Sequence, residues 1–477
     1  MERLQLDTLL ASYPAADKEK AAKLLAAELE KDPRKIVVLD DDPTGVQTVH
    51  DITVVTDWSE ESIRAGFMTK EKAFFILTNS RSFTAEETEK AHREIARRVW
   101  EVSHSLNRDF ILVSRGDSTL RGHYPLETEV LRQTLEEQGS APFDGEVICP
   151  FFPEGGRYTA ENIHYVKEKD QLVPCGETEF AKDKTFGYQS SDLGQWVEEK
   201  TGGKYRAAEC TYISLSTLRA GNVEQITRQL CQVSGFGKVI VNALDYSDLT
   251  VFCTALYRAL GQGKRFLYRT AAAFVKVAAG VTDKPLLSRE ELVDSTGVPG
   301  GLVVAGSHTK KTTSQLAAMQ ALPQVDTVIF NQHLVVEPEA VFQAEIDRVV
   351  AECENLLKAG KTVSVCTRRE RLDLNTGNKE DELRISVKIS DAVTSIVKRL
   401  SVRPAFLIAK GGITSSDIGT KALGVKRARV AGQVKPGIPV WLCGEESKFP
   451  GLPYVIFPGN VGEETTLREI VEELTRS

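Results

Sequence analysis

The sequence predicts an α/β protein with two domains, each a mostly parallel sheet flanked by helices. The chain has 477 residues, which is more than a single hydrophobic core ordinarily serves. Short β-branched strand patterns alternate with amphipathic helix patterns in both halves, and this alternation is typical of parallel sheets covered by helices. A hydrophobic content of 41% and a charged content of 27% are ordinary for a globular protein.

The first half of the chain divides into an extension and a domain. Residues 1–35 are expected to form a helical N-terminal extension, in which Leu24, Leu25 and Leu29 share one face. The first domain is expected over 36–285. Its strands are predicted at 37–39, 74–77, 111–113, 147–149, 239–242 and 266–268, and its clear helices at 85–103 and 126–137. Periodicity is lost over 151–204, a stretch too long for an ordinary loop, so an inserted subdomain or functional segment is expected there.

The segment 283–301 has turn-forming residues at both ends and is the best position for a domain boundary. The second domain is expected over 300–477. Its strands are predicted at 302–305, 328–330, 362–366, 406–409, 440–443 and 454–457, with helices at 313–320, 341–358, 390–400 and 465–474.

Composition excludes several classes of protein. The formal net charge of -7 argues against a nucleic-acid partner, which would require a basic surface. No apolar stretch approaches the roughly 20 residues of a membrane span, and the most apolar segment, 271–281, contains Lys276. Asp7, Asp17 and Lys18 interrupt any region that could resemble a signal peptide. Eight cysteines without a C-x-x-C pair predict reduced thiols and a cytoplasmic protein.

Polar and charged residues follow four consecutive strands of the first domain. They are Asp40, Asp41 and Asp42 after the first strand, Arg81 after the second, Ser114, Arg115, Gly116, Asp117 and Arg121 at the third, and Arg157 after the fourth. Ligands of open α/β sheets bind outside the carboxyl ends of the strands. Arginine binds carboxylates in a bidentate way and aspartate accepts hydrogen bonds from hydroxyls, so the set suits a small polyhydroxylated anion. The alternative is that these charges only pair with one another in solvated loops.

The three adjacent aspartates repel one another, which a purely structural turn has no need to tolerate. Asp40 could cap or brace the turn. Asp41 and Asp42 are then the candidates for a substrate contact and for a general base toward a hydroxyl. Coordination of Mg²⁺ is the competing role, and the sequence does not separate the two.

Glycine-rich turns follow three predicted strands of the second domain. They are Gly306-Ser307, Lys410-Gly411-Gly412-Ile413-Thr414 and Pro458-Gly459-Asn460. Glycine lets the backbone approach a phosphate closely, and free N–H groups at a helix start hold its charge. Each turn alone is weak evidence, because structural strand-to-helix loops often contain glycine. Together with the acidic turn of the first domain, they suggest phosphoryl transfer, although neither the P-loop nor the dinucleotide fingerprint is present.

Several of these motifs resemble the four-carbon acid sugar kinase family. In the first half they are Asp41-Asp42-x-Thr44-Gly45, Ser80-Arg81, the D-S-T-L-R-G string at 117–122, F-P-x-G-G-R at 152–157 and the segment from Glu177 to Asp183. The three glycine turns are similar to the nucleotide-binding domain of the same family. The resemblance covers about 36–470, and D-S-T-L-R-G is its most specific part. The chain departs from the common pattern in an extra N-terminal helix, in a third aspartate followed by Pro43, and in Ser114-Arg115-Gly116, where many members place a lysine before D-S-T.

The resemblance implies ATP-dependent phosphorylation of a small acid sugar, such as threonate, erythronate or 3-oxo-tetronate, with ATP and Mg²⁺ as cofactors. Implied substrate contacts are Asp41 or Asp42, Arg81 and 114–117, to which Arg121 and Arg157 are added from their positions at strand ends. Implied ATP contacts are Ser307, Gly411, Gly412, Ile413, Thr414 and Gly459. Two alternatives remain open: a lyase or epimerase acting on sugar acids, and a sensor that binds both ligands without turnover. A homodimer is also left open.

Overall fold

The computed structural model describes residues 4–293, 296–306, 309–370, 372, 379–459 and 461–476. The chain divides into two compact units, Met1–Asp283 and Lys284–Ser477. Each unit has an α/β architecture with a mostly parallel sheet flanked by helices, which confirms the predicted fold class.

Unit 1 contains a large sheet, a small sheet and the helices around them. Its strands are β1 (Lys35–Asp40), β2 (Ile52–Val55), β3 (Ala73–Leu77), β4 (Phe110–Arg115), β5 (Gly145–Cys149), β6 (Arg157–Ala160), β7 (Ile163–Glu168), β8 (Gln171–Pro174), β9 (Thr211–Ile213), β10 (Gly237–Val241) and β11 (Phe266–Thr270). Its α-helices are α1 (Leu6–Ala11), α2 (Lys18–Lys31), α3 (Glu60–Met68), α4 (Ala85–Leu106), α5 (Leu126–Glu137), α6 (Leu193–Lys200), α7 (Leu215–Arg219), α8 (Val223–Gln232), α9 (Tyr246–Gly261) and α10 (Ala272–Ala278). Short 3₁₀ turns lie at Ser80–Ser82, Pro153–Gly155, Cys175–Glu177, Glu179–Lys182 and Ala207–Glu209.

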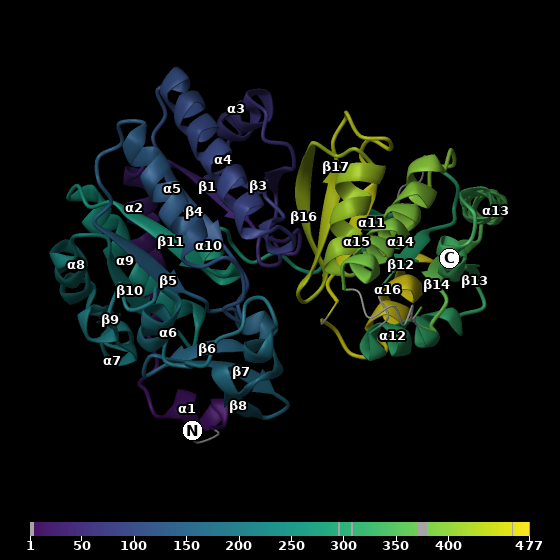
Figure 1. Ribbon diagram of the computed structural model, residues 1–477. Helices are drawn as coiled ribbons and strands as arrows, with labels where there is room; N and C mark the ends of the chain where they lie inside the picture. The colour runs from purple at the N-terminus through teal and green to yellow at the C-terminus, as the bar shows by residue number, and fades with distance from the viewer. Residues whose placement is uncertain are drawn as a thin grey trace. The chain divides into compact units, whose positions relative to one another are not determined.

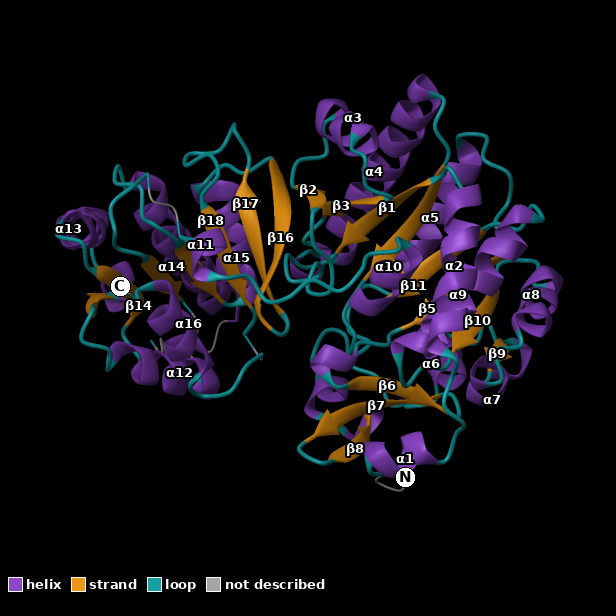
Figure 2. Ribbon diagram, turned by 180° about the vertical axis from the view of Figure 1, so that it is seen from behind, coloured by secondary structure: helices purple, strands orange, loops and turns teal. Residues whose placement is uncertain are grey.

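The large sheet of unit 1 has the strand order β2-β3-β1-β4-β11-β5-β10-β9, and all of these strands run parallel. Helices α3, α4 and α5 pack together on one face, and α2, α8 and α9 pack together on the other (Figures 1 and 2). All six residues of β1 are buried because both faces of the sheet are covered. Val37 and Leu39 of β1 share a core cluster with Ile95 and Val99 of α4.

The segment 151–204, where periodicity fails in the sequence, has structure of its own. Strands β6, β7 and β8 form a three-stranded antiparallel sheet, and α6 follows them. Trp196 of α6 is fully buried and stacks on Tyr124, with ring centroids 4.4 Å apart. The insertion therefore packs onto the region that follows β4, where the D-S-T-L-R-G string lies.

Unit 2 is a second α/β layer structure. Its strands are β12 (Leu302–Ala305), β13 (Val325–Phe330), β14 (Thr362–Thr367), β15 (Leu407–Lys410), β16 (Arg427–Lys435), β17 (Ile438–Cys443) and β18 (Pro453–Phe457). Its helices are α11 (Arg289–Leu292), α12 (Lys310–Gln320), α13 (Glu339–Lys358), α14 (Lys379–Arg399), α15 (Gly412–Asp417) and α16 (Thr466–Leu474), with a 3₁₀ turn at Gln332–Val336 and a π-helical turn at Ile418–Ala422.

The sheet of unit 2 has the order β13-β14-β12-β15-β18-β17-β16. The first five strands are parallel, and β17 and β16 continue the sheet in antiparallel fashion. Helices α12 and α16 pack together, as do α13 and α14 (Figure 1).

The structure bears on two expectations from the sequence, the lack of a membrane span and the lack of disulfides. In the part of the chain that is described, no helix is long and apolar enough to cross a membrane. All eight cysteines lie within the described ranges and are free thiols, as the absence of C-x-x-C pairs predicts.

Candidate functional site

The charged residues of unit 1 gather at the carboxyl edge of its sheet. Strands β3, β1, β4, β11 and β5 are consecutive in the sheet, so their ends are neighbours. Asp40 ends β1 and lies opposite Arg115, which ends β4. In turn, Arg115 lies opposite Thr270, which ends β11. The sheet order thus brings together side chains that are far apart in the sequence.

Asp41 is held by two arginines. Arg81 donates to both of its carboxylate oxygens, from Nε at 3.0 Å and from Nη2 at 2.7 Å. Arg115 Nη1 donates to Asp41 Oδ1 at 3.2 Å. Burial alone would raise the pKa of Asp41, but the charges of Arg81 and Arg115 outweigh it and hold the pKa below its usual range. Asp41 is therefore a charged anchor for the arginines, with both oxygens already engaged.

Asp40 is buried beneath the same turn. Its Oδ1 accepts from Arg115 Nη1 at 3.2 Å. A Cβ at Gly45 would lie 2.0 Å from Asp40 Oδ2, so only glycine fits at that position. Burial raises the pKa of Asp40 to about 7, against the opposing charge of Arg115. This position agrees with a bracing role for Asp40.

Asp42 is the most accessible of the three aspartates. Its Oδ1 accepts from the backbone N–H of Thr44 at 2.8 Å and from the Thr44 hydroxyl at 2.5 Å. Its Oδ2 lies 3.5 Å from Arg81 Nη1. Asp42 therefore has a fixed orientation and one oxygen that is only loosely paired.

The D-S-T-L-R-G loop adds a second charge cluster next to Arg81. Asp117 Oδ2 accepts from Arg121 Nε at 2.7 Å, and Asp117 Oδ1 lies 3.8 Å from Arg81 Nη1. Arg121 Nη1 also lies 3.7 Å from Asp183 Oδ2 of the insertion. Burial would raise the pKa of Asp117, but Arg81 and Arg121 outweigh it and hold the pKa well below its usual range.

Arg157 has a buried donor, Nε, that is not used within the described part of the chain. Its guanidinium lies 5.6 Å from the ring centre of Phe180, and that of Arg121 lies 5.1 Å from the same ring. Arg157 Nε is buried without a hydrogen-bond partner among the described residues. Burial lowers the pKa of Arg157. An anion placed beside Phe180 would satisfy this cation.

In unit 2, the glycine turns follow three adjacent strands, β12, β15 and β18. The N–H of Gly411 donates to the carbonyl of Phe457 at 2.9 Å. Lys410 Nζ donates to the carbonyl of Pro458 at 2.6 Å. Thr414 Oγ1 would lie 3.2 Å from a Cβ at Gly306, so the turns after β12 and β15 are also in close approach. Three of the predicted nucleotide segments therefore meet at one sheet edge.

The residues of unit 2 that are predicted to contact ATP differ in backbone conformation and in exposure. Gly411 has φ +113°, which an L-residue rarely adopts, and Gly412 begins α15. Ile413 is 65% exposed, and a Cβ at Gly459 would meet nothing within 4 Å. Burial, together with the charge of Lys311, lowers the pKa of Lys410 to about 7. The predicted contact Ser307 lies outside the described residues.

Two family models match the chain. A model of a sugar-binding N-terminal domain matches residues 36–278, and a model of a nucleotide-binding C-terminal domain matches residues 302–467. The chain belongs to the four-carbon acid sugar kinase family. The sugar-binding match contains the arginine–aspartate cluster, and the nucleotide-binding match contains all three glycine turns.

Solved structures of other proteins share the fold. A Haemophilus influenzae protein, HI1011, of the DUF1537 family is 17% identical, with a TM-score of 0.60; the alignment covers 92% of this chain and 100% of that one. A Salmonella typhimurium LT2 protein provisionally named a tRNA synthase is also 17% identical, with a TM-score of 0.63 and coverage of 92% and 98%. At this identity the likeness shows the fold alone. No curated protein sequence matches the chain.

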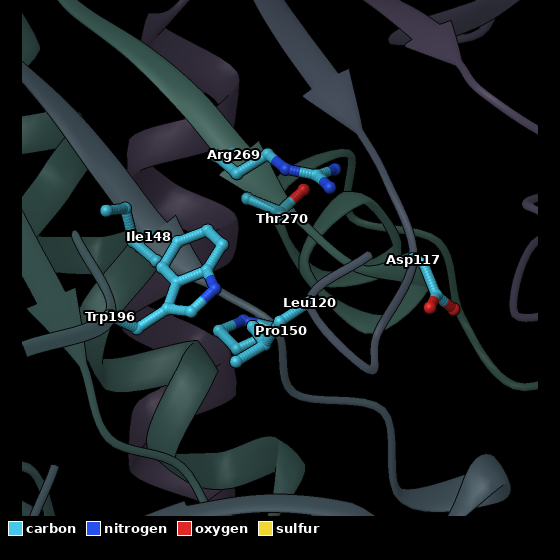
Figure 3. A pocket seen from close by; sticks show the side chains of 7 residues that line it. All are labelled: Asp117, Leu120, Ile148, Pro150, Trp196, Arg269 and Thr270. Carbon is cyan, nitrogen blue, oxygen red and sulfur yellow. The ribbon is translucent and has the colours of Figure 1, made fainter. Parts of the chain in front are cut away.

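In this acid sugar kinase family member, Arg269 lies within the candidate site and was not predicted from the sequence. It lies at the end of β11, is 4% exposed, and donates from Nη2 to the carbonyl of Arg121 at 2.9 Å. Its Nη1 is buried and has no hydrogen-bond partner in the described part of the chain. Figure 3 shows Arg269 extending toward the loop that carries Asp117. The available signal was its position immediately after a predicted strand at 266–268.

Arg269 also explains why position 116, predicted to contact the substrate, is a glycine. A Cβ at Gly116 would lie 1.1 Å from Arg269 Nη1, so the glycine leaves room for the guanidinium. The N–H of Gly116 donates to the carbonyl of Thr270 at 2.9 Å. Ser114 is buried in β4, opposite Leu39 and Arg269 in the register. Both residues therefore lie at the site edge, and Gly116 has a packing role there.

The carboxylates of the family's sugar-binding domain do not form a ready-made metal centre. Among the residues that the structure describes, no group of three or more His, Cys, Asp or Glu side chains could hold a metal ion. Mg²⁺ commonly binds through one or two carboxylates, water and substrate phosphates. The donor set fits a Mg²⁺ ion that arrives with a nucleotide better than one held by the protein alone.

Proposed function

We propose that the protein is an ATP-dependent kinase that phosphorylates a hydroxyl group of a small acid sugar, in carbohydrate catabolism. The substrate class is a four-carbon aldonate or oxo-aldonate such as threonate, erythronate or 3-oxo-tetronate. The observation that carries the proposal is the pairing of two sites on one chain: an arginine–aspartate cluster in the sugar-binding domain and converging glycine turns in the nucleotide-binding domain. Phosphoryl transfer requires mainly positioning and charge neutralisation, which such sites supply.

Unused arginine donors support recognition of an acid. Arg81 is engaged by Asp41 and Arg115 Nη1 by Asp40 and Asp41, whereas Arg115 Nε, Arg157 Nε and Arg269 Nη1 have no partner among the described residues. A buried guanidinium with free N–H groups is stabilised by a carboxylate. We therefore assign the substrate carboxylate to Arg115, Arg157 or Arg269, with Arg81 and Arg121 shaping the site around it.

Asp42 is the proposed general base. Both oxygens of Asp41 accept from arginines, and its pKa is held low, so it is a poor proton acceptor. Asp42 is oriented by Thr44 and has its Oδ2 at 3.5 Å from Arg81. It can accept a hydrogen bond from the attacking hydroxyl and then its proton.

The nucleotide is assigned to the turns after β12, β15 and β18. The backbone of Gly411, Gly412 and Thr414 and the open turn at Gly459 suit phosphate groups, and the exposed side chain of Ile413 suits contact with an apolar part of the nucleotide. Ser307 remains a prediction. A bound Mg²⁺ would neutralise phosphate charge, and its coordination by Asp41 or Asp42 remains a prediction from the sequence.

A coupled ADP-release screen over four- and five-carbon aldonates and their oxo forms tests the proposal. ADP should form only when a particular acid sugar is present, and the rate should saturate with that sugar. Consumption of an acid sugar without ADP release would favour a lyase or epimerase. Calorimetric binding of both ligands with no turnover would favour a sensor.

A further inference from the structure

The D-S-T-L-R-G loop adopts a conformation that needs support from outside. Leu120 has φ +67°, in the left-handed region that a leucine rarely occupies, and its N–H donates to the carbonyl of Asp117 at 3.1 Å. Gly122 has φ +117°. Such a backbone persists only where its surroundings hold it in place.

Two residues of the insertion bind consecutive carbonyl groups of this loop. His164 Nε2 lies 2.8 Å from the carbonyl oxygen of Ser118, and the hydroxyl of Tyr188 donates to the carbonyl of Thr119 at 2.7 Å. Both His164 and Tyr188 are buried. The two donors come from separate parts of the insertion, β7 and the segment before α6, so they hold the loop at two independent points.

The partners of His164 determine its tautomer. A carbonyl oxygen only accepts, so the proton facing Ser118 must be on Nε2. Nδ1 lies 2.9 Å from the hydroxyl oxygen of Thr159 and therefore accepts from it. Burial lowers the pKa of His164 to about 4, which keeps the ring neutral and this hydrogen-bond arrangement intact near neutral pH.

Apolar packing fixes the same loop. Leu120 belongs to a buried cluster that includes Tyr188, Leu193 and Trp196 of the insertion. Figure 3 shows Leu120 beside Trp196 and Pro150. These residues line a small cavity of about 10 Å³. The side chain of the residue with the unfavourable φ is thus packed against the insertion.

The charged ends of the loop belong to the candidate site. Asp117 lies 3.8 Å from Arg81, and Arg121 contacts Asp117, Asp183 and the ring of Phe180. A shift of the 118–120 backbone would move both charged side chains. The insertion therefore controls where this part of the site lies.

We propose that His164 and Tyr188 are positioning residues, which hold the 117–122 loop in the conformation that binds the acid sugar. The assignment rests on the proposed function in that the ligand is an acid sugar. Neither residue is a substrate contact; each acts through a backbone carbonyl of the loop.

The first test compares two hydroxyl deletions of matched kind. Tyr188→Phe removes the bond to Thr119, and Tyr257→Phe removes a bond of the same type, from Tyr257 to the carbonyl of Ala278 at 2.6 Å in the same unit. Tyr188→Phe is expected to raise the KM for the acid sugar about tenfold without changing the KM for ATP, whereas Tyr257→Phe leaves both unchanged. Equal changes in both variants would overturn the assignment.

The second test needs no substrate. Amide hydrogen exchange at 117–122 should accelerate at least about tenfold in Tyr188→Phe and remain at the wild-type rate in Tyr257→Phe. Unchanged exchange in the loop overturns the proposal, whether or not a substrate is known. Absence of turnover with every acid sugar contradicts the proposed function instead, so the two failures are distinguishable.

Histidine variants test the tautomer assignment. His164→Gln keeps an amide N–H that can donate toward Ser118 and is expected to keep wild-type exchange within about threefold. His164→Leu removes both ring nitrogens and should accelerate exchange at 117–122. Faster exchange in His164→Gln to the same extent as in His164→Leu would contradict a donor role for Nε2.

Discussion

At the residue scale, the three neighbouring aspartates after β1 have three different surroundings. Asp40 is buried against Gly45, Asp41 is bound by the fork of Arg81, and Asp42 is oriented by Thr44 with one oxygen loosely paired. Burial and opposite charge act on them in different proportions, so the same side chain can brace, anchor or accept a proton.

Asp42→Asn should reduce kcat by about 10²- to 10⁴-fold while ATP affinity is unchanged, because the amide cannot take the proton of the attacking hydroxyl. Single-turnover rates and calorimetry with ATP measure the two effects. Asp170→Asn is the control, since Asp170 is an exposed residue between β7 and β8. A single-turnover rate within tenfold of wild type would remove Asp42 from this role.

The pKa of Asp40 predicts a pH dependence of stability. Its value in the folded protein is about 7, raised from 3.8, so the folded state holds this proton more tightly than the unfolded state. The stability that it contributes is full below the unfolded pKa and is lost as pH rises through about 7. The free energy of unfolding of wild type should therefore fall relative to Asp40→Asn between about pH 5 and about pH 8. Denaturant titrations measure this, and a constant difference would contradict the assigned pKa.

At the element scale, glycines mark the places where strand ends meet other groups. Gly116 leaves room for Arg269 at the end of β4, and Gly411 supplies φ +113° at the start of α15. The sequence alone does not show why these two positions are glycines. Gly116 depends on a side chain from a strand distant in the sequence, and Gly411 depends on the local backbone conformation.

Gly116→Ala should destabilise unit 1 by about 1–3 kcal/mol and weaken acid-sugar binding, because the new Cβ overlaps the guanidinium of Arg269. The matched control is Gly261→Ala at the end of α9, where a Cβ would meet nothing within 4 Å. Thermal unfolding and calorimetry with the acid sugar measure both effects. Equal behaviour of the two variants would mean that Arg269 does not occupy this position in solution.

Gly411→Ala should weaken ATP binding by at least about tenfold, because the required φ is strained for alanine at the turn assigned to phosphate. Gly424→Ala introduces a residue at φ +64°, where a Cβ would meet nothing within 4 Å, and should leave ATP affinity unchanged. Calorimetry on both variants decides the matter. Undiminished affinity in Gly411→Ala would move the nucleotide site elsewhere.

Some helices were predicted within a few residues, but α8 and α9 were not predicted, and α14 begins at Lys379, well before the predicted start at 390. The helix predicted at 126–137 is α5, and the one predicted at 341–358 lies within α13. Strand β16 was not predicted, because its sequence mixes charged residues with few β-branched ones and its pairing shifts register at Gly432, which has φ +146°. The short strands β6 to β8 are partly buried, and Val166 of β7 packs in a cluster with Leu120 and Trp196, a context that a local pattern does not contain.

At the scale of the whole molecule, strand order determines how much of the site is predictable. The rule that ligands bind at carboxyl strand ends predicted the convergence of Asp41, Arg81 and Asp117, because their strands are close in the sequence. Arg269 was missed since β11 comes late in the chain yet lies between β4 and β5 in the sheet. His164 was missed because its role depends on how the insertion packs.

The division into two units also has a functional consequence. Each unit has its own sheet and core, so damage at one proposed site should stay local. Gly411→Ala is therefore expected to retain acid-sugar affinity, and Gly116→Ala to retain ATP affinity. The homodimer left open by the sequence would be tested by light scattering of the wild-type protein.

The central claim, that this chain transfers a phosphoryl group from ATP to an acid sugar, is tested most directly by identifying the products. Phosphorus NMR of a reaction with ATP and the active acid sugar should show ADP and a new phosphate ester in equal amounts. The sugar should remain unchanged when ATP is omitted. ADP with free inorganic phosphate alone, or conversion of the sugar without ATP, would contradict the claim.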